Sequence, residues 1–204
     1  IQVTPKGENA IVIYGGANKT METGDLISAL DGSSPGDILL IQNEINCLPE
    51  LIELASAKQQ RIVFNAAPIT EEVLSYPLEE IEIFTFNEIE GHALSGEESP
   101  QDILDSLIDR FPTSQLILTL GEQGAIYKSS KTQFSQPAYP VKAIDSTGAG
   151  DTFIGYYLAG YVQGLPIEQC LNNACKAAAI SVTKEGAASS IPRNAEVRAF
   201  QQQT

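Results

Sequence analysis

Basic side chains are scarce in this 204-residue chain, which has 12 lysines and arginines against 26 aspartates and glutamates and a formal net charge of −14. A surface of that sign repels polyanions, so neither a nucleic acid nor an anionic membrane is expected as the main partner. Ligands that carry phosphate stay compatible with the composition, because backbone amides bind anions without any net positive charge.

Histidine and cysteine are also rare. The single histidine, His92, lies on the polar face of the helical segment "EIEGHAL", so neither a histidine-based triad nor a zinc site is expected. The three cysteines, Cys47, Cys170 and Cys175, form no metal spacing and no CxxC pair. Their odd number fits a reducing compartment, which predicts a cytoplasmic protein. Cys170 and Cys175 fall in an apolar helical pattern and are expected to be small core residues.

Long apolar runs and targeting signals are missing as well. No run approaches the ~18 residues of a membrane span. The opening "IQVTPKGENAIVIYGG" has neither the basic region nor the cleavage site of a signal peptide. It begins in mid-strand without an initiator methionine, which predicts that the chain is cut from a longer one. The motifs GxxxxGK[ST], GxGxxG, HExxH and GxSxG are all absent, and this excludes the usual nucleotide folds built on the first two.

Strands and helices alternate along most of the chain. Two β-like stretches at 1–4 and 9–14 flank the turn signal "PKGE" and predict a hairpin. This alternation predicts a single α/β domain whose mostly parallel sheet is covered on both faces. Strands are expected at 37–43, 61–67, 81–87 and 115–121, with an antiparallel continuation at 124–129 and 132–137, and helices at 48–60, 71–75, 88–94, 100–111, 148–163 and 167–184.

Polar residues recur at the carboxyl ends of the expected strands, which is the edge where open α/β sheets bind ligands. Asparagine is a common turn residue, so each one alone is explained by a turn, and only their recurrence at one edge points to a site. The residues are Asn43, Glu44, Asn65, Asn87, Thr119 and Gly121.

The segment "DSTGAGDT", residues 145–152, places small residues at the start of a long apolar helix. The amides of Gly148, Ala149 and Gly150 are orphan donors at that helix start, where the helix dipole also favours negative charge. Without bulky side chains, a phosphate can approach the backbone closely. Asp151 lies beside that anion position, either as a helix-stabilising residue or as a general base for a hydroxyl that attacks phosphorus. An anion cradle with a base is the minimum for phosphoryl transfer to an alcohol.

"DSTGAGDTF" also resembles the C-terminal signature of the ribokinase-like, phosphofructokinase-B family of carbohydrate kinases, and "GGAN" at 15–18 resembles the ribokinase branch. The resemblance covers essentially the whole chain. It continues, in the family's order and spacing, through "FNAAP" (64–68), "FTFNEIE" (84–90), "LILTLGEQGA" (116–125) and "AAAISVTKEGAASSIP" (177–192).

The resemblance implies a three-layer α/β/α fold and an ATP-dependent kinase that phosphorylates a sugar, a pentose in the first place. Ribose, phosphorylated at its 5-hydroxyl, is the expected substrate, with Asp151 as the catalytic base and Gly148, Ala149 and Gly150 as the anion hole. Mg²⁺ and K⁺ are the implied ions, and oxygen ligands suit such hard cations. Glu44 matches the position of a glutamate near the sugar.

Further site residues follow from the same resemblance. Asn87 and Glu90 match the residues near the triphosphate that help hold Mg²⁺, largely through water. Thr119, Gly121 and Gly124 match the loop that contacts ATP, and Cys175 takes a position near the adenine that is often Asn or His in the family. The potassium-type site is expected at Asp145, Thr147, Ser181, Lys184, Gly186 and Ser190, several of them through backbone carbonyls.

The chain departs from the family by lacking its N-terminal third, which carries the early aspartate and the Gly-Gly signature of the sugar site. We therefore expect residues 1–18 to be a remnant of the β-strand lid and residues 19–204 to be the nucleotide-binding and catalytic domain. A catalytically incompetent, truncated or pseudokinase remnant that only binds nucleotide is the alternative function. The sheet edge left by absent strands predicts self-association.

Overall fold

The computed structural model describes residues 2–3, 9–10 and 12–200. These residues group into two compact units. One comprises the start of the chain up to Ile13 together with 119–126 and everything from Phe134 onward, and the other comprises 14–118 and 127–133.

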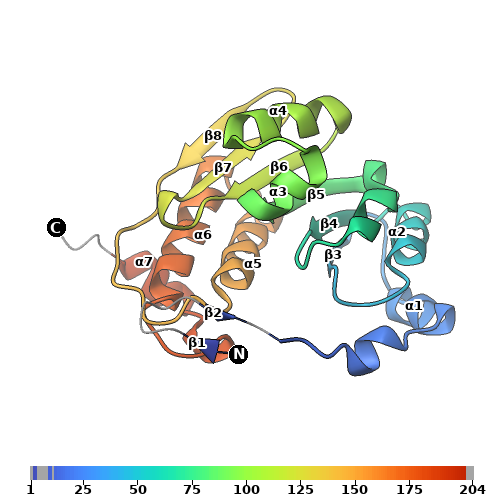
Figure 1. Cartoon of the computed structure of the whole chain (residues 1–204), viewed down its shortest axis with the longest axis horizontal. Coiled ribbons are helices and arrows are strands. Elements are labelled where there is room, and N and C mark those ends of the chain that lie inside the picture. The colour runs from blue at the N-terminus through green and yellow to red at the C-terminus, as the bar shows by residue number, and fades with distance from the viewer. Residues whose placement is uncertain (1, 4–8, 11, 201–204) are drawn as a thin grey trace. The chain divides into compact units, whose positions relative to one another are not determined.

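Six strands form one sheet in chain order, as Figure 1 shows. They are β3 (Ile38–Gln42), β4 (Arg61–Asn65), β5 (Ile81–Asn87), β6 (Gln115–Thr119), β7 (Ala125–Lys128) and β8 (Gln133–Gln136). β4 pairs in parallel with both β3 and β5, with Leu40 opposite Val63 and Phe64 opposite Phe84. β7 and β8 are joined by a tight turn in which the Ser129 N–H donates to the Thr132 carbonyl over 2.9 Å, so they run antiparallel. All six strands were expected from the sequence.

The parallel strands are buried to very different degrees. Ile62, Val63 and Phe64 of β4 are each 0% exposed, as expected for a parallel strand covered on both faces. β3 stands at the end of the strand order and pairs with β4 alone among the described strands. Its Leu40 is 45% exposed, so this edge of the sheet carries uncovered apolar surface.

Four α-helices belong to the unit built on 14–118: α1 (Thr23–Leu30), α2 (Leu48–Ala57), α3 (Glu88–Ser95) and α4 (Pro100–Arg110). Short 3₁₀ turns occupy Gly16–Lys19, Glu71–Ser75 and Leu78–Glu80. α2 packs on β4, and α3 packs on both β5 and α4. The expected helix at 48–60 ends three residues early because Gln59 takes a left-handed backbone with φ of 58°.

The other unit holds α5 (Ala149–Val162), α6 (Ile167–Ser181), α7 (Asn194–Ala199) and the 3₁₀ turns Gly121–Gln123 and Ala188–Ser190. α5 lies along α6, and α6 contacts α7. Cys170 and Cys175 are buried in α6, as expected. The helix expected at 167–184 is too long, because α6 ends at Ser181 and the Val182 carbonyl accepts from the Ile144 and Asp145 amides.

The expected N-terminal hairpin is confirmed in its pairing, since β1 (Gln2–Val3) and β2 (Asn9–Ala10) are antiparallel. Its turn at 5–8 lies outside the described residues. The strand expected at 9–14 does not extend through 12–14, where Val12 and Tyr14 are each 94% exposed.

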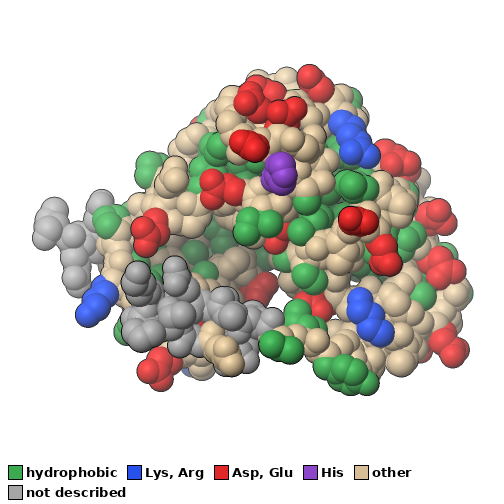
Figure 2. Space-filling view, viewed as in Figure 1, with side chains coloured by type: hydrophobic (Ala, Val, Ile, Leu, Met, Phe, Trp, Pro, Cys, Tyr) green, Lys and Arg blue, Asp and Glu red, His purple; other side chains and the backbone are tan. Residues whose placement is uncertain are grey.

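Acidic side chains outnumber basic ones on the face drawn in Figure 2, in keeping with the net charge. His92 is exposed, with its Nδ1 3.0 Å from the Glu97 carbonyl oxygen, as its place on a polar helix face predicts. Within the described ranges, every helix is too short or too polar to cross a membrane.

Candidate active site

Helix α5 begins at a glycine that no other residue could replace without strain. Gly148, its N-cap, has φ of 74°, in the left-handed region that favours glycine. A Cβ added there would also lie 3.2 Å from the Ala187 Cβ. The Ala149 N–H already donates to the Ser146 carbonyl over 3.2 Å, which holds the first turn in shape. The requirement for a small residue at Gly148 is therefore set by the protein itself.

The next two amides of α5 are open. Among the described residues, the N–H groups of Gly150 and Asp151 have no hydrogen-bond acceptor, as expected for a first helical turn. A Cβ added to Gly150 would meet no atom within 4 Å, so packing does not require a glycine there. Free amides, a helix N-terminus and empty space above the backbone together suit a bound oxyanion.

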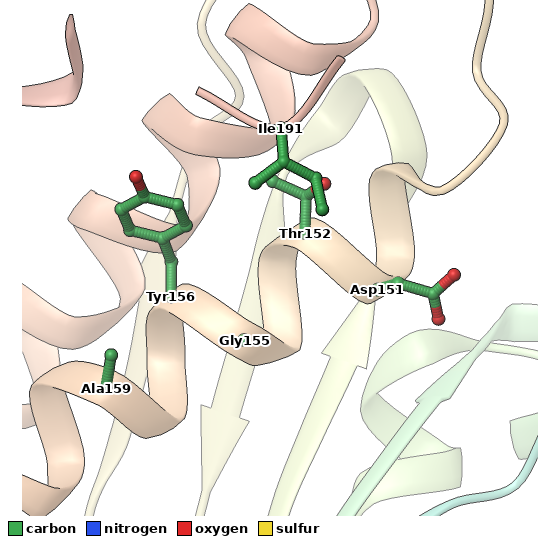
Figure 3. A pocket seen from close by; sticks show the side chains of 6 residues that line it. All are labelled: Asp151, Thr152, Gly155, Tyr156, Ala159 and Ile191. Atoms are coloured by element: carbon green, nitrogen blue, oxygen red, sulfur yellow. The ribbon is translucent and has the colours of Figure 1, made fainter. Parts of the chain in front are cut away.

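Asp151 presents its carboxylate beside those amides. The side chain is exposed, and it accepts no hydrogen bond from the part of the chain that the structure describes. Figure 3 shows it pointing away from Tyr156 and Ile191, out from the first turn of α5. A carboxylate with unoccupied oxygens at this place has the chemistry of a proton acceptor.

Asp145 ties the loop before α5 to the loop after α6. Its Oδ1 accepts from the Thr147 N–H and its Oδ2 from the Gly186 N–H, each over 2.9 Å. Hydrogen bonds from the side chain and backbone of Thr147, and then from Gly186, lower the pKa of the Asp145 carboxyl. The carboxylate thus stays ionised and braces the approach to the candidate anion site.

The remaining residues of the expected potassium-type site lie in the same unit, around the segment 181–190. The hydroxyls of Ser181 and Ser190 are buried and donate to the carbonyls of Ala178 and Ala187. Lys184 instead turns its ammonium to Glu196, with Nζ 2.8 Å from Oε1. No group of three or more His, Cys, Asp and Glu side chains in the described residues is placed to hold a metal, so a cation here would rely on carbonyl and hydroxyl oxygens. Such a donor set fits K⁺.

The two glycines of the expected ATP loop differ in the space around them. Gly124 has φ of 104°, and a Cβ there would clash with the Gln136 carbonyl oxygen, so the close approach of Gly124 to the end of β8 requires a glycine. Gly121 has φ of 52° and open space around it. Thr119 closes β6 just before this loop and is half-buried.

Cys175, expected near the adenine, is only 6% exposed. Its thiol donates to the Gln136 carbonyl, with Sγ 4.0 Å from the oxygen, and burial raises its pKa to about 12. The side chain is therefore a neutral, apolar wall rather than a nucleophile.

Asn87 and Glu90, the expected triphosphate and Mg²⁺ residues, belong to the unit built on 14–118 and form a capping box at the start of α3. Asn87 Oδ1 accepts from the Glu90 N–H over 2.9 Å, and its backbone and side-chain N–H groups donate to the two Glu90 oxygens over 2.8 and 3.0 Å. Burial raises the pKa of Glu90, and the bonds from Asn87 lower it in part. Because each Glu90 oxygen keeps a second lone pair, this pair fits a role that reaches Mg²⁺ through water.

Of the other strand-end residues in that unit, two make hydrogen bonds that hold the local structure, and the third has a side chain that could contact a ligand. Asn43 is buried and fully used, since its Nδ2 donates to the Pro68 carbonyl over 2.7 Å and its Oδ1 accepts from the Tyr76 hydroxyl over 3.0 Å. Asn65 closes a turn by accepting from the Ala67 N–H over 3.2 Å. Glu44, the expected sugar residue, is half-buried and its side chain is not held by any described neighbour.

Two residues of α5 that the sequence did not single out lie next to Asp151. Thr152 is 2% exposed, and its Oγ1 has no partner among the described residues. Together with Gly155, it lines a pocket of about 190 Å³, drawn in Figure 3. Periodicity alone could not identify either residue, because threonine and glycine are unremarkable in a helix until their neighbours are known.

Known proteins resemble this chain along nearly all of its length. It is 34% identical to the ribokinase of Staphylococcus aureus over 209 aligned residues, which cover 97% of this chain and 67% of that protein. The crystal structure of the Thermotoga maritima ribokinase superimposes with a TM-score of 0.78 at 33% identity, covering 97% of this chain and 66% of that one. The structure of an Arabidopsis thaliana ribokinase complexed with ribose and ATP gives a TM-score of 0.76 at 27% identity, covering 94% and 64%.

The chain therefore spans about two thirds of the length of the relatives it matches. Their likeness shows the fold expected from the sequence, a three-layer α/β/α arrangement around a mostly parallel sheet. The sequence pattern of the pfkB family of carbohydrate kinases matches residues 1–194. The chain belongs to the pfkB family of carbohydrate kinases.

Proposed function

We propose that this chain carries the phosphoryl-transfer half of a ribokinase, which phosphorylates the 5-hydroxyl of ribose with ATP to give ribose 5-phosphate. The observation that carries the proposal is the unengaged Asp151 carboxylate beside the open amides of Gly150 and Asp151 at the start of α5. Two relatives support it, the Staphylococcus aureus ribokinase and the Arabidopsis thaliana ribokinase complexed with ribose and ATP.

The proposed step uses each feature of the helix start. Asp151 accepts the proton of the sugar hydroxyl while the oxygen of that hydroxyl forms a bond to the γ-phosphorus of ATP. The bond between this phosphorus and the oxygen that leaves with ADP breaks in the same step. Negative charge that develops on the transferred group is stabilised by the open amide of Gly150 in the proposed 148–150 anion hole, by the open amide of Asp151, and by the positive end of the α5 dipole. General-base assistance of this kind contributes about 10²–10⁴-fold to a rate.

The proposal also assigns residues to ATP, the sugar and the ions. Thr119, Gly121 and Gly124 line the nucleotide, Cys175 offers an apolar wall to the adenine, and Glu44 contacts the sugar. Asn87 and Glu90 would hold Mg²⁺ through water, and Mg²⁺ neutralises charge on the phosphates when it is bound. K⁺ would lie among Asp145, Thr147, Ser181, Lys184, Gly186 and Ser190, where it steadies the loop that carries the anion hole.

The proposal also includes the domain boundaries and the location of the protein. Residues 1–18 act as the remaining strands of a lid, and 19–204 form the nucleotide-binding and catalytic domain. The three free cysteines, Cys47, Cys170 and Cys175, are compatible with a cytoplasmic location.

A second candidate function is a nucleotide-binding remnant without turnover, favoured by the span of only about two thirds of each relative. ATP consumption with a panel of pentoses and hexoses separates the two. The proposed kinase gives ribose-dependent ADP release when the missing third of a relative is supplied. ATP binding without ADP release under the same conditions would favour the remnant.

The exposed edge of β3 supports self-association of the isolated chain. The Asp37 carbonyl accepts from the Arg61 N–H over 2.9 Å, and backbone groups of a parallel strand alternate in direction, so those of Ile38 and Leu40 point away from β4. An open edge with an exposed leucine is a template for another strand. Light scattering is expected to show a mass that grows with concentration, and a monomer at high concentration would refute this part.

A further inference from the structure

Five polar side chains converge on one pocket in the unit that holds α5, α6 and α7. The pocket measures about 310 Å³, which is large enough for a small metabolite. None of the five side chains makes a hydrogen bond or an ion pair with another residue in the described part of the chain. They are the carboxamides of Gln163, Gln169, Asn173 and Asn194 and the guanidinium of Arg198.

The helical period explains why these residues meet. Residues four apart lie on one face of a helix. On α6 these are Gln169 and Asn173. On α7 they are Asn194 and Arg198, and Gln163 is the C-cap of α5. Each of the three helices therefore presents one face to the same pocket.

The helices around the pocket are held to one another. Tyr156 lines the pocket from α5, and its hydroxyl donates to the Pro192 carbonyl over 2.7 Å, just before α7 begins. Val197 of α7 is 2% exposed and packs with Ala177 and Ile180 of α6. The polar side chains thus project from backbones that are already fixed, which lowers the entropic cost of binding a ligand.

Arg198 gives the pocket its charge. Among the described residues, none of those that line it is an aspartate or a glutamate. Arg61, Lys128 and Lys184 are each held in a salt bridge, whereas Arg198 forms none with any described residue. The end of α5 and the start of α6 both border the pocket, and their dipoles have opposite signs, so the guanidinium decides which charge is favoured. In a chain of net charge −14, this pocket is a local exception that favours an anion.

We propose that the pocket binds a small hydroxycarboxylate, an organic acid with one carboxylate and several neighbouring hydroxyls. A guanidinium pairs with a carboxylate through two parallel N–H···O bonds, and its single charge matches that of a carboxylate better than that of a phosphate. A carboxamide both donates and accepts, as does a hydroxyl, so four carboxamides suit a ligand with several hydroxyls. The apolar surface of Ala159, Gly160 and Leu165 would contact the carbon chain of the ligand.

This pocket shares no residue with the site proposed for phosphoryl transfer. None of the residues that line it is assigned to ATP, the sugar or the ions, and Asp151 is not among them. The two sites do share α5, which carries Asp151 in its first turn and ends next to Gln163. The inference therefore goes beyond the proposed function and does not depend on turnover.

The test is a titration of the purified chain with gluconate, followed by calorimetry and by the backbone amide resonances. Sorbitol, a neutral polyol with the same number of carbons, is the matched ligand. Gluconate is expected to saturate the parent chain and to shift amides within 160–173 and 194–198. Sorbitol is expected to bind at least about tenfold more weakly, because it cannot form the charge-assisted bonds.

Three variants assign the binding to the pocket. Arg198→Gln removes the charge at an exposed position and is expected to weaken gluconate binding by about tenfold or more. Asn173→Leu places an apolar side chain in the pocket and is expected to abolish binding. Lys131→Gln removes the same charge at an exposed position outside the pocket and should bind gluconate as the parent does. Melting curves confirm that each variant is folded.

The inference would be overturned by any of the following results: no saturable binding of gluconate by the parent, equal affinity for sorbitol, tighter binding of inorganic phosphate at the same amides, retained binding in Asn173→Leu, or equal losses in Lys131→Gln and Arg198→Gln. The readout needs neither ATP nor ribose, so its failure leaves the proposed kinase function standing. Absence of ribose phosphorylation in the completed enzyme would defeat the kinase proposal alone.

Discussion

Replacing Gly155 by alanine should stabilise the isolated chain. Glycine in a helix interior costs about 0.5–1 kcal/mol relative to alanine, and nothing lies within 4 Å of the added Cβ to oppose the gain. For a chain of this size, 1 kcal/mol corresponds to roughly 2–4 °C in melting temperature. Thermal and urea denaturation of the purified chain should therefore show a rise of about 1–4 °C and a higher midpoint with an unchanged m-value.

Gly160→Ala is the matched comparison on the same helix. Its Cβ would lie 3.0 Å from the Cys170 Sγ and 3.4 Å from the Leu165 Cδ1, so these side chains would have to give way by a few tenths of an ångström. Overpacking of this kind costs about 1–3 kcal/mol, which outweighs the gain in helix propensity. A neutral or destabilising Gly155→Ala, or a stabilising Gly160→Ala, would refute the reasoning that Gly155 faces open space while Gly160 faces α6.

Further predictions concern the start of α5. Gly150→Val should weaken ATP binding by at least about tenfold, because its side chain fills space that no protein atom occupies; unchanged binding would remove the anion cradle. The hydrogen bonds to the Asp145 carboxylate stabilise the fold fully at pH values above 3.8, the ordinary pKa of an aspartate. This stabilisation is lost as the pH falls through the lowered pKa that Asp145 has in the folded chain. The Gly186 amide resonance should thus titrate with a midpoint below 3.8, and a midpoint above it would contradict the bond. Replacing K⁺ by a bulky organic cation should slow turnover in the completed enzyme, and equal rates would count against the cation site.

Much of the fold follows from local sequence signals. The run "RIVFN" is apolar at its centre, and it forms a strand buried on both faces. The sequence does not predict helix α1, because only Leu26 and Leu30 of its eight residues are buried. Two buried residues leave too little hydrophobic periodicity to indicate a helix. The end of α6 was misplaced because it depends on the loop before α5, whose amides bind the Val182 carbonyl across nearly forty positions of sequence.

In the candidate site, too, some features follow from the local sequence and others depend on contacts between distant residues. The glycines around Asp151 point to an anion site through their residue types alone, and the structure gives separate reasons for Gly148 and Gly150. The unsatisfied Thr152 hydroxyl and the bare Gly155 could not be inferred from the sequence, since both depend on which neighbours reach α5 in space. The bond from Cys175 to the Gln136 carbonyl likewise joins residues far apart in the chain.

The most direct test of the central claim is the turnover and ATP affinity of Asp151→Asn, measured with ribose in the enzyme completed by the missing third of a relative. Asparagine keeps the size of the side chain but cannot accept the proton from the sugar. Turnover is expected to fall by at least about 100-fold while the dissociation constant for ATP stays nearly unchanged. Turnover close to that of the parent, or an equal loss of ATP affinity, would contradict the role of Asp151 as the base.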